Sequence, residues 1–154
     1  MPVSSVLGRI AALVFVMTLA ACQTLGGAGL VRSTVTADLT PVAAGAIASD
    51  MAGRLTEQLG PGNTTIALTL DGSAFGQALE TSLKGQGYAI VTDQKAGNGA
   101  TVPLAYVVDD FEGSVLVRVS TPAVELTRMY KVSPAGAEPV SPLSVMARSA
   151  EGTP

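Results

Sequence analysis

The sequence contains no histidine, no tryptophan and a single cysteine among its 154 residues. Without histidine, catalytic triads of the Ser-His-Asp kind, histidine metal sites and imidazole proton shuttles are excluded. One cysteine excludes an intrachain disulfide and a cysteine-rich zinc site. Charged residues make up only 14% of the chain, with a net charge of −3 and no block of basic residues. The composition therefore argues against most common enzymes and against nucleic acid as a partner.

Aromatic residues are also scarce, at 4% of the chain, whereas apolar residues of all kinds make up 47%. The core must therefore consist mainly of valine, leucine, isoleucine and alanine. A chain of this length has room for one domain and for little of a second.

The first 21 residues have the composition of a signal peptide. Arg9 precedes an apolar run from Ile10 to Ala20. As a helix, a run of this length spans about 16 Å, which is too short for a bilayer core of about 30 Å. The run therefore predicts the hydrophobic region of a signal peptide, residues 1–21, and not a transmembrane anchor.

The residues Leu19-Ala20-Ala21-Cys22 resemble the lipobox of bacterial lipoproteins. This resemblance implies cleavage just before Cys22 and lipidation of its thiol, and an anchor of two or three acyl chains is effectively permanent. In lipoproteins of this kind, Gln23 in place of aspartate implies the outer membrane. The alternative is an ordinary secretory signal cleaved near Ala21, with Cys22 left as a free thiol.

Residues 40–132 are predicted to form an α+β domain. Thr40 and Pro41 form a helix start, and apolar residues recur at every fourth position up to Leu59. A second helix is expected from Ser73 to Gly85, between alternating strands at Thr64–Leu70 and Tyr88–Thr92. This order of strand, helix and strand predicts parallel pairing through a right-handed crossover.

Three further strands are expected after a polar, glycine-rich loop, at Thr101–Val108, Val115–Ser120 and Ala123–Val132. Their short connections predict an antiparallel meander. Pro103 favours an edge position or the start of its strand. The prediction is a two-layer α+β fold, in which two helices pack on a mixed sheet of about five strands.

The segments on either side of this domain are expected to have little structure. Residues 22–39 are rich in glycine, serine and threonine and are interpreted as a lipid-anchored tether, although an edge strand around Leu30–Val35 is an alternative. The proline-rich tail 133–154 is expected to be largely disordered. Its apolar residues between Val140 and Met146 either pack on the domain or bind a partner.

The groupings that resemble catalytic or ligand sites are incomplete. Asp71-Gly72-Ser73 at a helix start has no basic residue nearby to help bind an anion, so we interpret it as a capped turn. The acidic run Asp109–Glu112 lacks the further oxygen ligands of a calcium loop and is interpreted as a solvated hairpin turn. Three glycine pairs, which form neither a dinucleotide-binding motif nor a P-loop, are interpreted as turns: Gly60-Pro61-Gly62, Gly85-Gln86-Gly87 and Gly97-Asn98-Gly99. The sequence thus predicts no catalytic residue, cofactor, metal site or small-molecule substrate.

Three stretches of the domain, 48–68, 75–95 and 103–113, together with the lipobox and Ser141–Met146, resemble the TrbH family. These are conjugal-transfer lipoproteins of the Trb mating-pair-formation system. The resemblance implies a structural part in a plasmid-encoded type IV secretion apparatus, at the periplasmic side of the outer membrane. It implies a membrane contact through lipidated Cys22 and binding to other subunits of the channel core complex. Cys22 is the one functional residue that it carries over.

Two other function classes stay open. A free-standing envelope lipoprotein, with a small ligand- or protein-binding domain, would share the anchor but not the part in conjugation. A peptidoglycan hydrolase would need two carboxylates on either side of one glycosidic bond. Asp71, Glu80, Asp109 and Glu112 are present, but nothing in the sequence places any two of them together.

Overall fold

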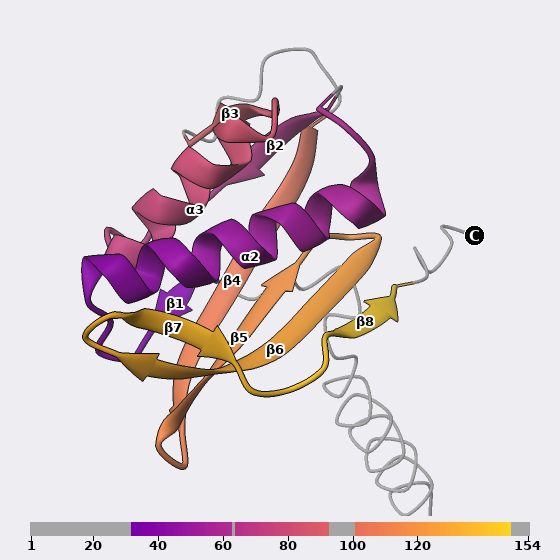
Figure 1. Ribbon diagram of the computed structural model, residues 1–154. Coiled ribbons are helices and arrows are strands. Elements are labelled where there is room, and N and C mark those ends of the chain that lie inside the picture. Colours follow the sequence, from indigo (N-terminus) through magenta and orange to yellow (C-terminus); the bar gives the residue numbers. More distant parts are fainter. Residues whose placement is uncertain (1–31, 63, 93–100, 149–154) are drawn as a thin grey trace, which may run out of the picture.

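The computed structural model describes residues 32–62, 64–92 and 101–148 (Figure 1). The predicted signal peptide, Cys22 and the glycine-rich loop before the meander lie outside these residues. In chain order the elements are β1 (Thr34–Val35), α2 (Pro41–Leu59), β2 (Thr65–Leu68), α3 (Ala74–Gly85), β3 (Ala89–Val91), β4 (Thr101–Phe111), β5 (Ser114–Ser120), β6 (Val124–Ser133), β7 (Gly136–Pro139) and β8 (Ser144–Ala147). Among the described helices, none is both long and apolar enough to cross a membrane.

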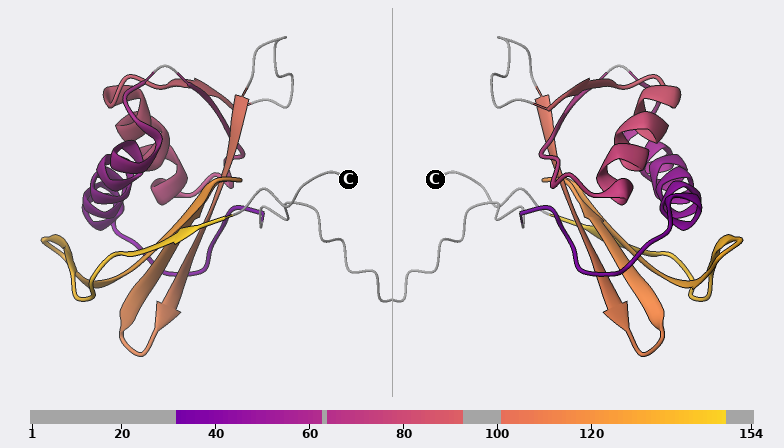
Figure 2. Two further views of the ribbon diagram at one scale, coloured as in Figure 1. Left: turned by 90° about the vertical axis from the view of Figure 1, so that its right-hand side faces the viewer. Right: turned by 90° about the vertical axis from the view of Figure 1, so that its left-hand side faces the viewer.

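The elements form two layers, with both helices on one face of a mixed sheet (Figure 2). The strand order is β3-β2-β4-β5-β6-β7, with β1 beside β4 and β8 beside β6. The predicted α+β class is therefore confirmed. The sheet has eight strands where about five were expected, because β1, β7 and β8 lie in the segments that were interpreted as tether and tail.

The predicted strand pairings are present. β2 pairs in parallel with β3, its neighbour across α3, and also with β4. From β4 onward the sheet is the expected antiparallel meander of β4, β5 and β6. Pro103 lies opposite Ala67 of β2, whereas the pairing of β4 with β5 begins only at Ala105. The proline thus occupies the part of β4 that β5 does not reach, as an edge preference requires.

Helix α2 starts and ends where the sequence indicates. The Thr40 side chain accepts a hydrogen bond from the backbone N–H of Ala43, and Pro41 occupies the first turn. The apolar stripe of Ile47, Met51 and Leu55 is completely buried against the sheet. Burial of this stripe, with apolar residues of α3 and of the strands below, is the main source of stability.

The folded domain begins before residue 40. Thr34 and Val35 pair in parallel with Val107 and Val108 of β4, and the Thr36 backbone N–H donates a 2.9 Å hydrogen bond to the Val108 carbonyl. Two residues of the alternative edge strand around Leu30–Val35, Thr34 and Val35, therefore do form a strand. This pairing joins positions more than 70 residues apart, so local sequence could not favour it over a tether.

The segment 133–148 was expected to be largely disordered and instead forms two strands along the free side of β6. β7 pairs with the last residues of β6, and β8 pairs with its first residues. Prolines do not prevent this, because Pro134 lies in the turn between β6 and β7, while Pro139 ends β7. The tail therefore packs on its own domain, at least as far as residue 148.

Candidate interaction surface

The start of α3 is a closed cap and not an anion site. The Asp71 carboxylate oxygen Oδ1 accepts hydrogen bonds from the Ser73 backbone N–H (3.0 Å), the Ser73 hydroxyl (2.6 Å) and the Tyr106 hydroxyl (2.7 Å). The Ser73 hydroxyl in turn accepts a hydrogen bond from the Gly76 backbone N–H at 3.0 Å. Ser73 thus caps the helix through the Gly76 N–H, and the Asp71 carboxylate lies beside this terminus, as the interpretation of a capped turn requires.

This cap also sets the acidity of its members. Burial raises the pKa of Asp71, but the hydrogen bonds from Ser73 and Tyr106 outweigh it and leave the pKa below its ordinary value. Burial and the hydrogen bond to Asp71 raise the pKa of Tyr106 to about 12. A β-carbon at Gly76 would meet the Tyr106 hydroxyl, so this glycine gives the tyrosine room to reach Asp71.

The acidic run at the end of β4 forms a hairpin, as expected, but with a shorter turn. β4 continues to Phe111, and the turn consists of Glu112 and Gly113, with φ angles of 48° and 77°. The Asp109 carboxylate accepts a 2.8 Å hydrogen bond from the Thr36 hydroxyl. Among the described residues, no group of three or more acidic or sulfur side chains could hold a metal ion.

Two of the glycine pairs form turns that contact each other. A β-carbon on Gly62 would meet the carbonyl group of Gly87. The Tyr88 hydroxyl donates a 2.6 Å hydrogen bond to the Gly60 carbonyl and joins the two turns further. Their role is therefore structural, as predicted, and the third pair lies in the loop outside the described residues.

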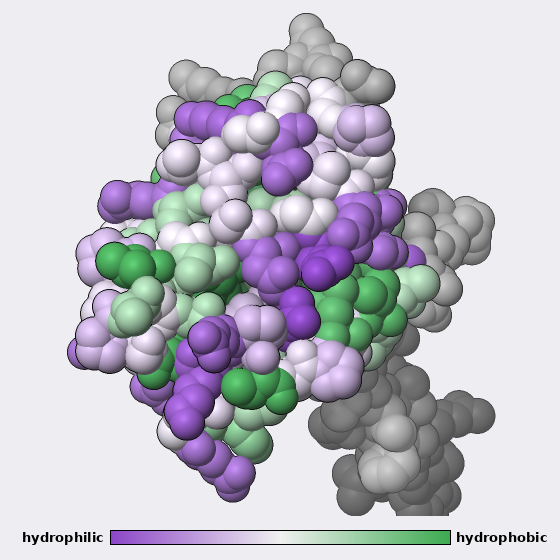
Figure 3. All heavy atoms as spheres, viewed as in Figure 1, coloured by the Kyte–Doolittle hydropathy of each residue, from purple (hydrophilic) through white to green (hydrophobic). Residues whose placement is uncertain are grey.

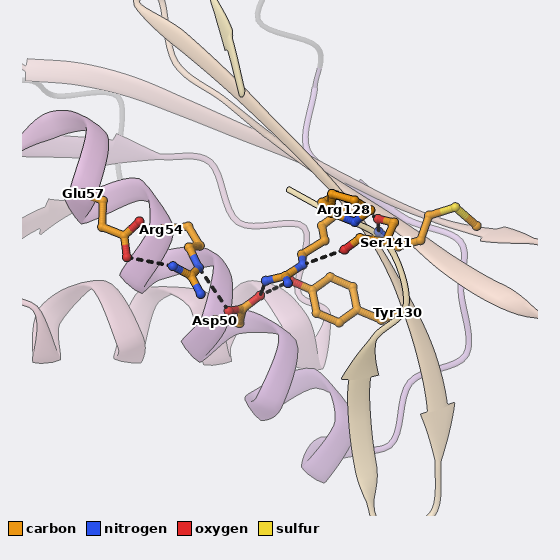
Figure 4. A network of polar contacts seen from close by, with 8 residues as sticks. Asp50, Arg54, Glu57, Arg128, Tyr130 and Ser141 are labelled. Atoms are coloured by element: carbon orange, nitrogen blue, oxygen red, sulfur yellow. Dashed lines mark hydrogen bonds and ion pairs between the residues drawn. The ribbon is translucent and has the colours of Figure 1, made fainter. Parts of the chain in front are cut away.

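A polar cluster joins α2 to β6 and to the segment before β8 (Figure 4). The Asp50 carboxylate oxygen Oδ2 accepts hydrogen bonds from Arg128 Nη1 at 2.8 Å and from the Tyr130 hydroxyl at 2.6 Å. Arg128 Nε donates to the Ser141 carbonyl at 3.1 Å. We call these four residues the Asp50 cluster. One carboxylate thus fixes a helix, a strand and the C-terminal segment relative to one another.

The sequence pattern missed most of this cluster. The i,i+4 spacing of Asp50 and Arg54 predicts an ion pair between them. That pair is present at 3.6 Å, but the shorter contacts of Asp50 are to β6. A signal was available, because Arg128 and Tyr130 follow the buried Leu126 at alternate positions and so point to the helix side. An arginine on that face needs a carboxylate partner. Burial, with the hydrogen bond to Asp50, raises the pKa of Tyr130 far above its ordinary value.

Ser141 lies between β7 and β8, where the pairing with β6 shifts in register. Its hydroxyl accepts a 2.9 Å hydrogen bond from the backbone N–H of Met129, which lies between the stretches of β6 paired with β7 and with β8. Val140 N–H donates to the Met129 carbonyl at 2.9 Å. Both polar groups of the Met129 backbone are therefore satisfied at the irregularity, and the Asp50 cluster fixes the place where β8 begins.

β8 follows as an exposed strand with apolar side chains. Val145 is 46% exposed and Met146 is 57% exposed. Val145 lies opposite the buried Leu126, on the helix side of the sheet, and Met146 lies opposite Glu125, on the face without helices. Apolar surface gathers where Figure 1 places β8 (Figure 3). The backbone of β8 thus pairs with β6, while the side chains of Val145 and Met146 stay exposed to solvent.

Two arginines share one carboxylate beside Met146, on the face of the sheet without helices. Arg118 Nε lies 3.5 Å from Glu125 Oε1, and Arg148 Nη2 lies 3.6 Å from Glu125 Oε2. The Ser120 hydroxyl donates a further 3.2 Å hydrogen bond to Glu125. Arg118 Nε is buried and has no hydrogen-bond partner among the described residues. We call Glu125, Arg118, Arg148 and Ser120 the Glu125 cluster. Because it has two guanidinium groups and one carboxylate, the cluster carries a net charge of one positive unit.

The four carboxylates considered for catalysis have separate environments. Glu80 pairs with Lys84 at 2.7 Å on the surface of α3, whereas Asp71 accepts hydrogen bonds from Tyr106 and from Ser73, the N-cap residue of the same helix. Asp109 bonds to Thr36, and Glu112 lies in the hairpin turn. The contacts of Asp71, Glu80 and Asp109 thus hold parts of the fold together. Cys22, the predicted lipidation site, lies outside the described residues.

The comparisons with known proteins agree with one another. The family model described as "Conjugal transfer protein TrbH" matches residues 25–149. A curated relative from Sinorhizobium fredii (strain NBRC 101917 / NGR234), named "Probable conjugal transfer protein TrbH", is 48% identical over 141 residues, which cover 88% of this chain and 95% of the relative. No solved structure matches the chain.

Proposed function

Because the chain belongs to the TrbH family of conjugal transfer proteins, we propose that it is a lipid-anchored structural component of a plasmid-encoded type IV secretion apparatus. In this proposal Cys22 carries the lipid, and the domain faces the periplasm from the outer membrane. The domain binds other subunits of the channel core complex and transforms no substrate. Lipid anchoring would raise its effective concentration next to membrane-embedded partners, so that modest contacts suffice for assembly.

The observation that carries the proposal is the lipobox Leu19–Cys22, which lies just before the region that matches the family, residues 25–149. Gln23 supports sorting to the outer membrane. The relative's name supports a part in conjugal transfer, and the match covers nearly the whole chain.

The use of charged side chains in the described residues also supports a binding role. Asp50 and Asp71 each join parts of the fold that are distant in sequence, and Glu125 pairs with one arginine of β5 and one that follows β8. What the domain presents to other molecules is the exposed strand β8 with its apolar side chains. An exposed strand of this kind is a surface for binding, since it offers backbone groups and apolar area to a protein partner.

Replacement of the anchor residue tests the proposal. In donor cells, Cys22→Ser should abolish labelling with radioactive palmitate, move the protein from the membrane to the soluble fraction and lower the mating frequency. Gln23→Asp is the matched control, because it keeps the thiol. It should keep the label and shift the protein from the outer to the inner membrane.

Two outcomes would contradict the proposal. If Cys22→Ser left labelling, fractionation and mating as in the wild type, the protein would have no anchor at this residue. If deletion of the whole gene left mating normal, the protein would act in the envelope outside the transfer apparatus.

A further inference from the structure

The free edge of β8 differs from the other outer edges of the sheet. Sheet edges are usually protected by charge, proline, shortness or a covering element, because their unpaired backbone groups bind other strands. β7 has Glu138 and Pro139 and lies alongside α2 (Figure 1), whereas β3 has only three residues and β1 only two. β8, with the sequence SVMA, contains neither charge nor proline, and all four of its residues are exposed.

The pairing with β6 shows which backbone groups of β8 point outward. Arg148 N–H donates to the Ala123 carbonyl at 2.8 Å, so Arg148 and Ala123 form a hydrogen-bonded pair of the antiparallel ladder. Such pairs alternate, so Met146 and Ser144 also face β6. The N–H and C=O groups of Val145 and Ala147 therefore point away from the sheet. Among the described residues, no strand pairs with this side of β8.

Charge indicates the chemistry of a strand that would pair there. The Glu125 cluster has two guanidinium groups for one carboxylate, and it lies beside Met146 on the face without helices. An added strand places alternate side chains on that face, next to Met146 and Arg148. A carboxylate at such a position would balance the excess charge and offer an acceptor to Arg148.

The same charges argue against a second copy of this chain as the occupant. Antiparallel pairing of β8 with itself would bring residues between Val140 and Arg148 to the Glu125 cluster. This stretch contains no aspartate or glutamate, so the excess positive charge would stay unbalanced and be repeated. The cluster thus favours another protein.

We propose that the outer edge of β8 binds an extended segment of another protein by strand addition, and that this segment carries apolar residues on one face and a carboxylate on the other. The segment pairs with the outward backbone groups of Val145 and Ala147, its apolar residues cover Val145, and its carboxylate meets Arg148. Resting on the proposed function, the inference assigns this segment to a subunit of the transfer apparatus.

Photocross-linking in mating-competent donor cells tests the assignment with the full-length protein. The photoreactive residue p-benzoylphenylalanine replaces Met146, and the same residue at Val42 is the control, since Val42 is equally exposed, at 58%, on α2. We expect a product from position 146 that antibodies identify as this protein joined to a transfer-apparatus subunit, and we expect no such product from position 42.

A second substitution at Val145 separates backbone pairing from simple contact. Val145→Pro removes an outward N–H and leaves the ladder to β6 intact, whereas Val145→Thr keeps the N–H and the branched shape. Loss of one backbone hydrogen bond, with its acceptor left unpaired, should reduce the cross-linked product about tenfold in the proline variant. The threonine variant should retain the product.

The charge is tested in parallel by Arg148→Glu against Arg148→Lys. Charge reversal should lower the amount of product about fivefold or more, and the lysine variant should keep it. This pair leaves the backbone of β8 unchanged, so it keeps the proposal testable if the proline variant is degraded in cells. The amount of each full-length variant and its resistance to protease are measured alongside.

The inference is overturned if position 146 gives no product, if it gives only a product with a second copy of this chain, or if the members of both matched pairs give equal amounts. These failures differ from failure of the proposed function. If deletion of the gene stops mating and the edge variants mate normally, strand addition at β8 is wrong and the part in conjugation stands. If deletion leaves mating normal, the proposed function itself is wrong.

Discussion

The Tyr130 hydroxyl on β6 donates a 2.6 Å hydrogen bond to the Asp50 carboxylate on α2, across 80 residues of sequence. The same oxygen accepts a hydrogen bond from Arg128, which is mostly buried. Asp50→Ala should lower the free energy of unfolding by about 2–3 kcal/mol, because a partly buried guanidinium and a buried hydroxyl both lose their acceptor. Chemical denaturation of the purified protein measures this change.

The matched control is Glu57→Ala, about two turns further along α2. Glu57 pairs with Arg54 at the surface, with more than half of its side chain exposed. Its loss should change the free energy of unfolding by less than about 0.5 kcal/mol. Equal effects of the two substitutions would mean that Asp50 does not fix α2 to β6.

A second prediction compares two glycines within helices, Gly53 of α2 and Gly76 of α3. A β-carbon at Gly76 would meet the hydroxyl of Tyr106, whose ring is fixed by burial, whereas a β-carbon at Gly53 would meet nothing within 4 Å. Gly76→Ala should therefore destabilise the fold by about 1–3 kcal/mol. Gly53→Ala should stabilise it by up to about 1 kcal/mol, since alanine is the better helix former. Thermal unfolding of both variants distinguishes the effects, and stabilisation by Gly76→Ala would contradict the close contact.

A third prediction concerns alkaline pH. The pKa of Tyr106 is raised from 10.0 to about 12 in the folded protein by burial and by the hydrogen bond to Asp71. The unfolded chain loses this proton first, so stability is fully present below pH 10 and falls as the pH rises from 10 toward 12. Denaturation across this range measures the slope. Tyr106→Phe should make the slope shallower, and an unchanged slope would show that Tyr106 does not contribute.

A fourth prediction concerns the hairpin turn between β4 and β5. Glu112 has a φ of 48°, a left-handed conformation that glycine and asparagine adopt more readily. Glu112→Asn should raise the free energy of unfolding by about 0.5–1 kcal/mol. A matched substitution, Asp110→Asn, removes a carboxylate from the adjoining strand, where the backbone is extended, and should have a smaller effect. Equal gains from both would attribute the change to charge.

Local signals in the sequence were sufficient for the central part of the fold. Thr40 and Pro41 defined the start of α2, and its stripe at every fourth residue identified the buried face. Alternation identified β2 and the meander, because side chains on one face of each strand are buried. The family resemblance, now confirmed, came from three stretches of this central part together with the lipobox and Ser141–Met146.

The ends of the fold could not be predicted because distant contacts determine them. β1 has two residues and depends on β4, and β8 depends on the position that Ser141 gives it. A proline-rich composition favours disorder in an isolated segment. It does not show whether a strand elsewhere in the fold can pair with that segment. The Asp50 cluster was missed for the same reason, since Asp50 already had a plausible partner one turn away in Arg54.

The position of β1 limits where the folded domain can lie, if Cys22 carries a lipid. Ser33 is already buried in the domain, and 33 − 22 = 11 residue steps separate it from Cys22. Even a fully extended chain covers about 3.3–3.6 Å per residue, so the distance from the acylated sulfur to the domain is at most about 40 Å. The part of the domain around Ser33 must therefore lie within that distance of the lipid headgroups, and its partners can reach no further than the domain itself extends beyond this point.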